Sequence, residues 1–220
     1  MCDCRGQYVS MFVHKQTLIS LISFHLFHDF RTGSDHIREK DGIWASLAWL
    51  QILATKKTSV QSVLETHWKK FGRNYFSRLD YENLDSKLAE KMMSQVEEKV
   101  MKWTADEFMN KVVKPALANS NDKNVPEISL RDNFEYVDSV DGSKAIKQGY
   151  RIIFKDGNRI VLRLSGTGSS GATLRMYVEK YERNVIDKTA SDMLNSLICI
   201  ASEISDVKKL FGLEGPTVTT

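Results

Sequence analysis

The stretch Arg163-Leu-Ser-Gly-Thr-Gly-Ser-Ser-Gly-Ala-Thr-Leu-Arg175 organises the second half of the chain. It holds three glycines and five hydroxyl side chains between two arginines, and no acidic residue. Glycines let a backbone curl until several N–H groups point into one concavity, which can hold an anion. Hydroxyls add donors, and an arginine guanidinium matches phosphate oxygens two at a time. The composition therefore predicts a loop that binds a phosphate, a phosphosugar or a carboxylate.

Alternating apolar residues on both sides of the loop predict a sheet. Asp156-Gly157 is a strong hairpin signal within this pattern. Strands are expected near 133–139, 149–155, 159–164 and 173–180. Because side chains alternate along a strand, Arg163 and Arg175 are expected to point away from the apolar face, at the two ends of the glycine loop. An anion clamp needs this geometry, whereas the alternative is a Gly/Ser loop that binds nothing.

A second motif overlaps the same loop. Gly166-x-Gly168-x-x-Gly171 matches the dinucleotide-binding fingerprint, which requires the loop to open a helix. Residues 173–181 are rich in β-branched and aromatic side chains and favour a strand, although Leu174, Val178 and Tyr181 also fit a helical stripe. No acidic residue that would end a second strand follows at the required distance, and no Gly-Lys-Ser/Thr of a P-loop is present.

The residues 163–175 resemble the phosphate-binding loop in the last domain of the phosphoglucomutases, within the α-D-phosphohexomutase superfamily. A second stretch, Thr32-Gly-Ser-Asp-His-Ile-Arg-Glu-Lys-Asp-Gly-Ile-Trp-Ala45, resembles the segment that follows their sugar-binding loop. The resemblance covers roughly Thr32 to Thr220. It implies the interconversion of glucose 1-phosphate and glucose 6-phosphate by a four-domain enzyme. Such an enzyme uses a phosphoserine, a magnesium ion and glucose 1,6-bisphosphate.

The resemblance also assigns site residues. Arg163 and Arg175 are expected to clamp the substrate phosphate by bidentate hydrogen bonds. The remaining phosphate contacts are expected from hydroxyl or backbone donors of Ser165, Gly166, Thr167, Gly168 and Ser169. Lys40 matches the family lysine that reaches the bound phosphosugar.

Two parts of the family's catalytic apparatus have no counterpart in the sequence. The nucleophile sits in a Thr-Ala-Ser-His-Asn-Pro-like loop, and no Ser-His-Asn-Pro occurs. The magnesium loop is an Asp-Gly-Asp-Gly-Asp-Arg-like run, whereas Asp138-x-x-Asp141-Gly142 reads as a turn. We therefore expect no catalytic residue and no metal ligand here, and no mutase activity of this chain alone. The alternative function is a non-catalytic phosphosugar-binding module or an incomplete gene product.

Composition sets broad limits. The 220 residues are 42% hydrophobic and 27% charged with a net charge of +3, as in ordinary soluble proteins. The sequence contains no basic run with interleaved aromatics, the pattern that would predict nucleic-acid binding.

No membrane or disulfide signal is expected either. Thr17–Phe27 is apolar but far shorter than the ~20 residues of a transmembrane helix. The three cysteines predict no disulfide scaffold, and Cys199 is expected to be a buried thiol. A cytoplasmic protein that acts on a hexose phosphate, without nucleic acid or membrane, is expected.

Residues 1–31 depart from the family pattern. Where the phosphoglucomutases carry a Glu-Glu-Ser-Phe-Gly loop for the sugar hydroxyls, this chain has Phe27-His-Asp-Phe-Arg31. The hypothesis is an alternative start, spliced or mispredicted, that joins the family sequence near Arg31. A transcript whose reading frame extends upstream through Glu-Glu-Ser-Phe would contradict it.

The expected fold class is α/β followed by α+β. Residues 1–31 form the segment outside the family. Residues 32–118 form a mostly helical remnant of the third, α/β domain, 119–129 a linker, and 130–220 a C-terminal antiparallel sheet with helix (TBP-like). Helices are expected at 41–55, 59–71, 85–102, 104–115 and 187–211. Residues 130–212 are expected to fold alone, whereas the apolar stripes of 41–55 and 85–102 are expected to lack a partner surface.

Overall fold

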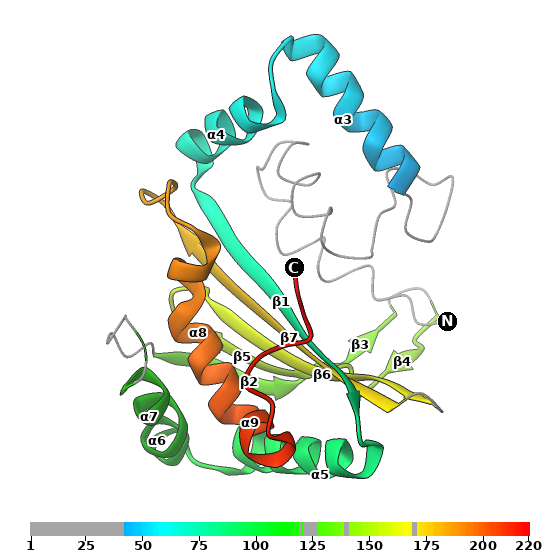
Figure 1. Ribbon diagram of the computed structural model, residues 1–220, viewed down its shortest axis with the longest axis vertical. Helices are drawn as coiled ribbons and strands as arrows, with labels where there is room; N and C mark the ends of the chain where they lie inside the picture. Colours follow the sequence, from blue (N-terminus) through cyan, green and yellow to red (C-terminus); the bar gives the residue numbers. More distant parts are fainter. Residues whose placement is uncertain (1–41, 119, 121–126, 139–140, 169–170) are drawn as a thin grey trace. The chain divides into compact units, whose positions relative to one another are not determined.

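The computed structural model describes residues 42–118, 120, 127–138, 141–168 and 171–220 (Figure 1). The chain divides into two compact units. The first comprises Met1–Arg73, Asp138–Ser143 and Arg183–Ile186, and the second comprises Asn74–Val137, Lys144–Glu182 and Asp187–Thr220. The residues expected to form a segment outside the family, 1–31, lie outside the described part of the chain.

The first unit contains two helices, α3 (Gly42–Lys56) and α4 (Val60–Phe71), which confirms the helices expected at 41–55 and 59–71. Ser59 caps α4, because its side-chain oxygen accepts from the Ser62 N–H at 3.2 Å. Trp49 and Val63 are buried together in a small apolar cluster. Of the apolar stripe expected on α3, Ile43, Leu47 and Leu50 are exposed, at 77%, 60% and 61%. Leu53 of the same stripe packs against the small cluster. That the stripe lacks a partner surface stays a prediction.

His67 on α4 gives the first unit a predicted dependence on pH. The side chain is buried beside Phe71, with ring centroids 4.8 Å apart, and desolvation lowers the pKa of His67 below its usual 6.5. The unfolded chain therefore binds the proton more readily than the folded one. The contribution of neutral His67 to stability is full above about pH 6.5 and is lost as the pH falls below it. A proton NMR titration of the ring should give a pKa below 6.5, and a normal value would contradict the burial.

The second unit is built on a six-stranded sheet with the order β2-β5-β6-β7-β1-β8. Its strands are β1 (Arg73–Leu84), β2 (Ile128–Asn133), β5 (Tyr150–Phe154), β6 (Arg159–Gly168), β7 (Gly171–Glu182) and β8 (Val218–Thr219). The pairs β2–β5, β5–β6, β6–β7 and β1–β8 are antiparallel. Three expected strands are confirmed in β5, β6 and β7. The strand expected near 133–139 is present only as the short strand β3 (Tyr136–Val137), and the longer strand β2 precedes it and ends at Asn133.

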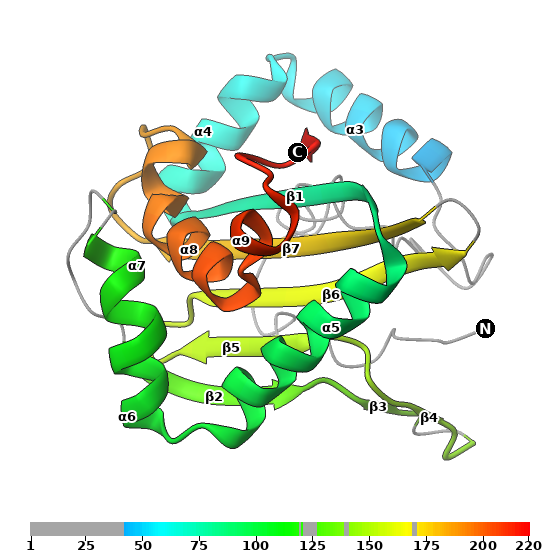
Figure 2. The same cartoon turned by 60° about the horizontal axis from the view of Figure 1, so that its bottom comes forward.

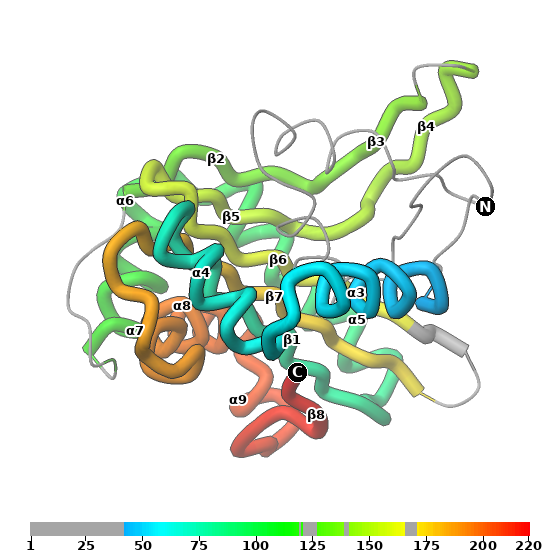
Figure 3. The backbone as a smooth tube through the Cα atoms, turned by 90° about the horizontal axis from the view of Figure 1, so that it is seen from above, coloured from blue at the N-terminus to red at the C-terminus, as the bar shows by residue number. Residues whose placement is uncertain are grey.

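A separate two-stranded ribbon follows β2. It consists of β3 (Tyr136–Val137) and β4 (Lys144–Ala145), paired antiparallel. Figure 3 shows this ribbon extending beyond the ends of β2 and β5. The turn expected at Asp138–Gly142 is present, since the Gly142 N–H donates to the Asp138 carbonyl at 3.0 Å.

Helices cover one face of the sheet (Figure 2). They are α5 (Ser86–Glu97), the π-helical η1 (Glu98–Lys102), α6 (Ala105–Phe108), the π-helical η2 (Met109–Val113), α7 (Lys114–Ala118), α8 (Ala190–Ser205) and α9 (Val207–Phe211). Ile152, Leu162 and Leu174 of the sheet are fully buried in one cluster with Met92 of α5 and Leu197 of α8. The observed mixture of helices and antiparallel sheet matches the expected fold class.

The structure corrects the expected domain boundary. Residues 74–118 belong to the same unit as the C-terminal sheet and not to the preceding helical remnant. The physical reason is that β1 occupies a place inside the sheet, between β7 and β8. The apolar stripe of helix 85–102, expected to lack a partner, is buried through Met92, Val96 and Val100 against that sheet. Most of the expected linker 119–129 lies outside the described residues.

The helix caps were largely predictable. The sequence Thr104-x-x-Glu107 has the pattern of a capping box, and the structure contains it: Thr104 Oγ1 accepts from the Glu107 N–H at 3.2 Å, and the Thr104 N–H donates to Glu107 Oε2 at 3.0 Å. This backbone hydrogen bond, together with Lys111, lowers the pKa of Glu107. The helix was expected to end near Pro115 but continues to Ala118, because a π-helical turn precedes the proline.

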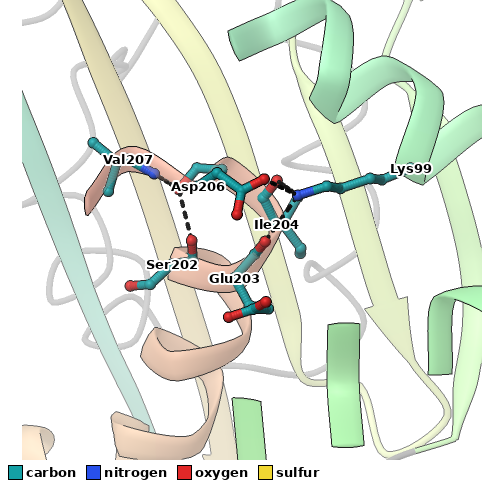
Figure 4. A network of polar contacts seen from close by, with 7 residues as sticks. Lys99, Ser202, Glu203, Ile204, Asp206 and Val207 are labelled. Atoms are coloured by element: carbon teal, nitrogen blue, oxygen red, sulfur yellow. Dashed lines mark hydrogen bonds and ion pairs between the residues drawn. The ribbon is translucent and has the colours of Figure 1, made fainter. Parts of the chain in front are cut away.

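A lysine ties two helical segments of the second unit together (Figure 4). Lys99 Nζ donates to the carbonyls of Glu203 and Ile204, at 3.0 and 2.9 Å, and to Asp206 Oδ2 at 2.7 Å. The two carbonyls belong to the last turn of α8, where intrahelical donors run out. Asp206 follows in the left-handed conformation, with φ at 53°. The helix expected at 187–211 is therefore two helices, broken at Asp206.

Candidate anion-binding site

The glycine-rich stretch forms the end of the β6–β7 hairpin. In the antiparallel register Arg163 lies opposite Arg175, Ser165 opposite Thr173, and Gly168 opposite Gly171. The register shifts between Ser165 and Gly168, which marks an irregularity where the strands approach the loop. Residues 169–170, which complete the turn, lie outside the described part of the chain. The strand expected near 173–180 is therefore confirmed, and the helix that a dinucleotide fingerprint requires is absent from residues 171–182.

The two arginines share one face of this hairpin, as the alternation predicted. Leu162, Leu174 and Met176 point into the buried core, whereas Arg163 and Arg175 are half-exposed on the other face. Directly opposite residues on antiparallel strands have Cβ atoms about 4.5–5.5 Å apart. Two like charges at that separation repel each other and are unfavourable in a sheet. An anion bound between the guanidinium groups would turn this repulsion into two attractions.

Some of the other expected site residues lie in the described part of the chain, and others lie outside it. Ser165 is half-buried in β6. The backbones of Gly166, Thr167 and Gly168 continue the same strand to its end. Ser169 and Lys40 lie outside the described residues. The structure thus brings together the two arginines and Ser165 at the base of the loop.

Gly171, at the start of β7, has a conformation and an environment that exclude other residues. Its φ is +90°, a region that residues with a Cβ rarely adopt. A Cβ added there would lie 3.1 Å from the Leu84 carbonyl oxygen and 3.3 Å from Asn83 Cα. The base of the loop is therefore seated directly against the end of β1. A residue with a Cβ would be strained at this close approach of two backbones.

A carboxylate that sequence reasoning missed lies beside Arg175. Asp80 of β1 is 3% exposed, and its Oδ2 lies 3.6 Å from Arg175 Nε. Arg78 Nε lies 3.1 Å from the other oxygen, Oδ1. The spacing of Arg78 and Asp80, which puts both on one face of a strand, was visible in the sequence. The proximity of Asp80 to Arg175 was not visible, because it depends on β1 being the neighbour of β7 in the sheet.

Other candidate chemistry is limited among the described residues. They contain no group of three or more His, Cys, Asp or Glu side chains placed to hold a metal ion. Asp138 and Asp141 instead accept hydrogen bonds within their own turn, from the backbone N–H groups of Asp141 and Ser143. Cys199 is partly buried against the core of the second unit, less fully than expected for a buried thiol. No helix in the described part of the chain is both long and apolar enough to cross a membrane.

The chain matches the models of known protein families over two stretches. Residues 73–217 match the family model described as the C-terminal domain of phosphoglucomutase-1. The chain belongs to the phosphoglucomutase family. Residues 25–71 match a second model, the alpha/beta/alpha domain III of phosphoglucomutase and phosphomannomutase. The junction of these matches, at 71–73, coincides with the start of β1.

Several phosphoglucomutases are similar over most of this chain. Human phosphoglucomutase-1 is 50% identical over 193 residues, which cover 87% of this chain and 33% of the relative. Phosphoglucomutase 1 of Drosophila melanogaster is 47% identical, with 87% and 32% covered. The chain thus spans about a third of the length of these relatives.

A solved phosphoglucomutase structure supports the fold. The crystal structure of the exocytosis-sensitive phosphoprotein pp63/parafusin from Paramecium, in its open form, aligns with a TM-score of 0.66 at 42% identity. The alignment covers 86% of this chain and 31% of the neighbour. The expected resemblance to the C-terminal portion of a phosphoglucomutase is thereby confirmed.

Proposed function

We propose that the second unit binds the phosphate group of a hexose phosphate at the end of the β6–β7 hairpin. The observation that carries the proposal is the pairing of Arg163 with Arg175, in register, at the base of a glycine-rich loop without acidic residues. Arginine forks bind phosphate oxygens bidentately, so two facing guanidinium groups can hold one phosphate from both sides. Ser165, Gly166, Thr167, Gly168 and Ser169 supply further hydroxyl or backbone donors.

The similarity to phosphoglucomutases supports a role for this site in a mutase reaction. In that role the chain positions the substrate and performs no bond-making step. Contacts to a remote, non-reacting phosphate fix the orientation of the reacting end, and their binding energy lowers the barrier elsewhere. The family resemblance also supports a role for Lys40 in phosphosugar binding. The reaction we propose for the larger enzyme is the interconversion of glucose 1-phosphate and glucose 6-phosphate.

Magnesium, which the family resemblance implies, has no fitting ligands among the described residues. Magnesium prefers carboxylate oxygens in near-octahedral geometry, and the described part of the chain groups no such set. Asp138 and Asp141 are engaged in their own turn. We therefore assign no step of the proposed function to a metal held by these residues.

Removal of both arginines tests the proposed clamp. Arg163→Ala and Arg175→Ala should each weaken the binding of glucose 6-phosphate by about 1.5–3 kcal/mol, since each removes hydrogen bonds to a charged group. Calorimetric titration of the 220-residue chain would measure the affinity. Lys155→Ala is the matched control, because it removes a positive charge from an exposed position of the same unit. Equal binding by wild type and the double variant would refute the assignment.

An activity assay tests the positioning role against catalysis by the chain itself. The chain alone, with magnesium and glucose 1,6-bisphosphate, is expected to show binding but no conversion of glucose 1-phosphate. Conversion would contradict the positioning role, and no binding would favour an incomplete gene product. Binding without conversion is also what a non-catalytic phosphosugar-binding module would show. We also propose a cytoplasmic location, supported by the similar relative from Bromus inermis named as cytoplasmic phosphoglucomutase.

A further inference from the structure

Asp80 is a buried acid next to the proposed phosphate clamp. In the first half of β1, Tyr75 and Leu79 belong to the apolar core, so Asp80 and Arg78 fall on the opposite face by the alternation of the strand. The Asp80 side chain is nevertheless almost fully buried, at 4% exposed. An ionised carboxylate is costly to bury unless it is paired. Its partners are two arginines, one on its own strand and one on β7.

Asp80 attracts Arg175 through its charge but forms no close hydrogen bond with the Arg175 Nε. Asp80 Oδ2 lies 3.6 Å from Arg175 Nε, beyond the usual length of a hydrogen bond. Arg175 Nε is also buried and has no hydrogen-bond partner among the described residues. The guanidinium is thus attracted toward β1 without a hydrogen bond from its Nε to Asp80. A closer bidentate pair, as between Arg151 and Asp132 at 2.8 and 2.5 Å, would use the guanidinium donors up.

The local charge balance shows why such a partner is needed. Arg163, Arg175 and Arg78 contribute three positive charges, and Asp80 contributes one negative charge, so the group keeps a net charge of +2. Without Asp80, Arg175 would be repelled by Arg163 across the hairpin and by Arg78 from β1. Its long side chain would then sample more rotamers before an anion binds, and binding would have to order it.

The backbone of Asp80 is fixed from the other side of β1. Asp80 lies opposite Val218 in the β1–β8 pair, and its carbonyl accepts from the Thr217 N–H at 2.8 Å. The end of the same strand touches Gly171 at the start of β7. The backbone of Asp80 is therefore held in place between the C-terminal residues and the β6–β7 hairpin.

From this geometry we propose that Asp80 is a positioning residue, which orders Arg175 for an anion. The proposal rests on the phosphate-clamp function proposed above and deepens it. Asp80 does not touch the anion, and it acts through Arg175. The C-terminal residues 217–220 take part because they hold the backbone of β1 around Asp80.

The test uses Asp80→Asn, which keeps the shape and removes the charge. Titration of the full 220-residue chain with inorganic phosphate should show a loss of affinity of about 2- to 10-fold, the cost of ordering one long side chain. Asp132→Asn is the matched control, because it breaks an aspartate–arginine pair of the same sheet away from the loop. Its phosphate affinity should equal that of wild type. Thermal melting would confirm that both variants fold.

A double-mutant cycle separates positioning from a general structural effect. In an Arg175→Ala background, Asp80→Asn should no longer weaken phosphate binding, because the side chain that it orders is gone. An equal loss in both backgrounds would overturn the proposal, as would unchanged or tighter binding by Asp80→Asn in the wild-type background.

A measurement on the ligand-free protein tests the positioning role of Asp80 separately from the phosphate-clamp function. The Nε–Hε NMR signal of Arg175 should report a restricted side chain in wild type and a mobile one in Asp80→Asn. If wild type binds no phosphate, the clamp function fails, and this signal alone decides the role of Asp80. An equally restricted Arg175 in both proteins would overturn the positioning role.

Discussion

Gly171→Ala is expected to destabilise the second unit by about 2–5 kcal/mol and to weaken phosphate binding. A φ of +90° costs a residue with a Cβ about 1–2 kcal/mol. The new Cβ would also lie 3.1 Å from the Leu84 carbonyl oxygen, and overpacking of this kind typically costs about 1–3 kcal/mol. The strands β7 and β1 would have to separate, which moves Arg175 away from Asp80. Urea denaturation and phosphate titration would measure the two effects.

Gly157→Ala is a close control for this prediction. Gly157 has nearly the same φ, +85°, but an added Cβ there has no neighbour within 4 Å. Its alanine variant should lose only the backbone contribution, about 1–2 kcal/mol, and keep wild-type phosphate affinity. Equal losses of stability in the two variants would show that the approach of Gly171 to β1 contributes nothing.

Lys99→Met is expected to destabilise the second unit by about 3–5 kcal/mol. The substitution keeps most of the apolar stem but removes a nearly buried ammonium that donates to two carbonyls and one carboxylate. The last carbonyls of α8 would lose their donor, and Asp206 would keep a half-buried charge without its lysine. Removing one partner of a buried pair typically costs about 3–5 kcal/mol, because the other charge is left uncompensated. The free energy of unfolding in urea would measure the loss.

Lys208→Met tests whether burial causes this effect. Lys208 also pairs with a carboxylate, that of Glu214 at 2.6 Å, but both side chains are largely exposed. Exposed pairs contribute about 0–1 kcal/mol, so this variant should differ little from wild type. A comparable loss in both variants would contradict the role given to the α8 terminus.

Much of the site was predictable because it depends on local patterns. Arg163 and Arg175 alternate with buried apolar residues, so their shared face followed from the period of a strand. The Asp156-Gly157 turn and the Thr104-x-x-Glu107 capping box also followed from residues within a few positions of each other. Such features are governed by local conformational preference and short-range hydrogen bonds. They are present in the structure as expected.

Contacts between distant segments could not be predicted. Nothing in residues 73–84 indicated that they form a strand between β7 and β8, and the domain boundary was therefore placed some 45 residues too late. The burial of the 85–102 stripe was missed for the same reason, since its partner surface is a sheet formed mainly by residues 128–182. Asp206, where the last helix breaks, contacts Lys99, about a hundred residues earlier in the chain.

The sequence by itself predicted an anion-binding loop, and it determined the shared face of the two arginines and the resemblance to the phosphoglucomutases. These rest on residue types and on spacing along one or two strands. Only the tertiary structure showed Asp80 beside Arg175 and the Leu84 backbone against Gly171. Both contacts join β1 to β7, whose residues are about 90 positions apart. The pairing of strands so far apart is decided by the packing of the whole core, which no local pattern encodes.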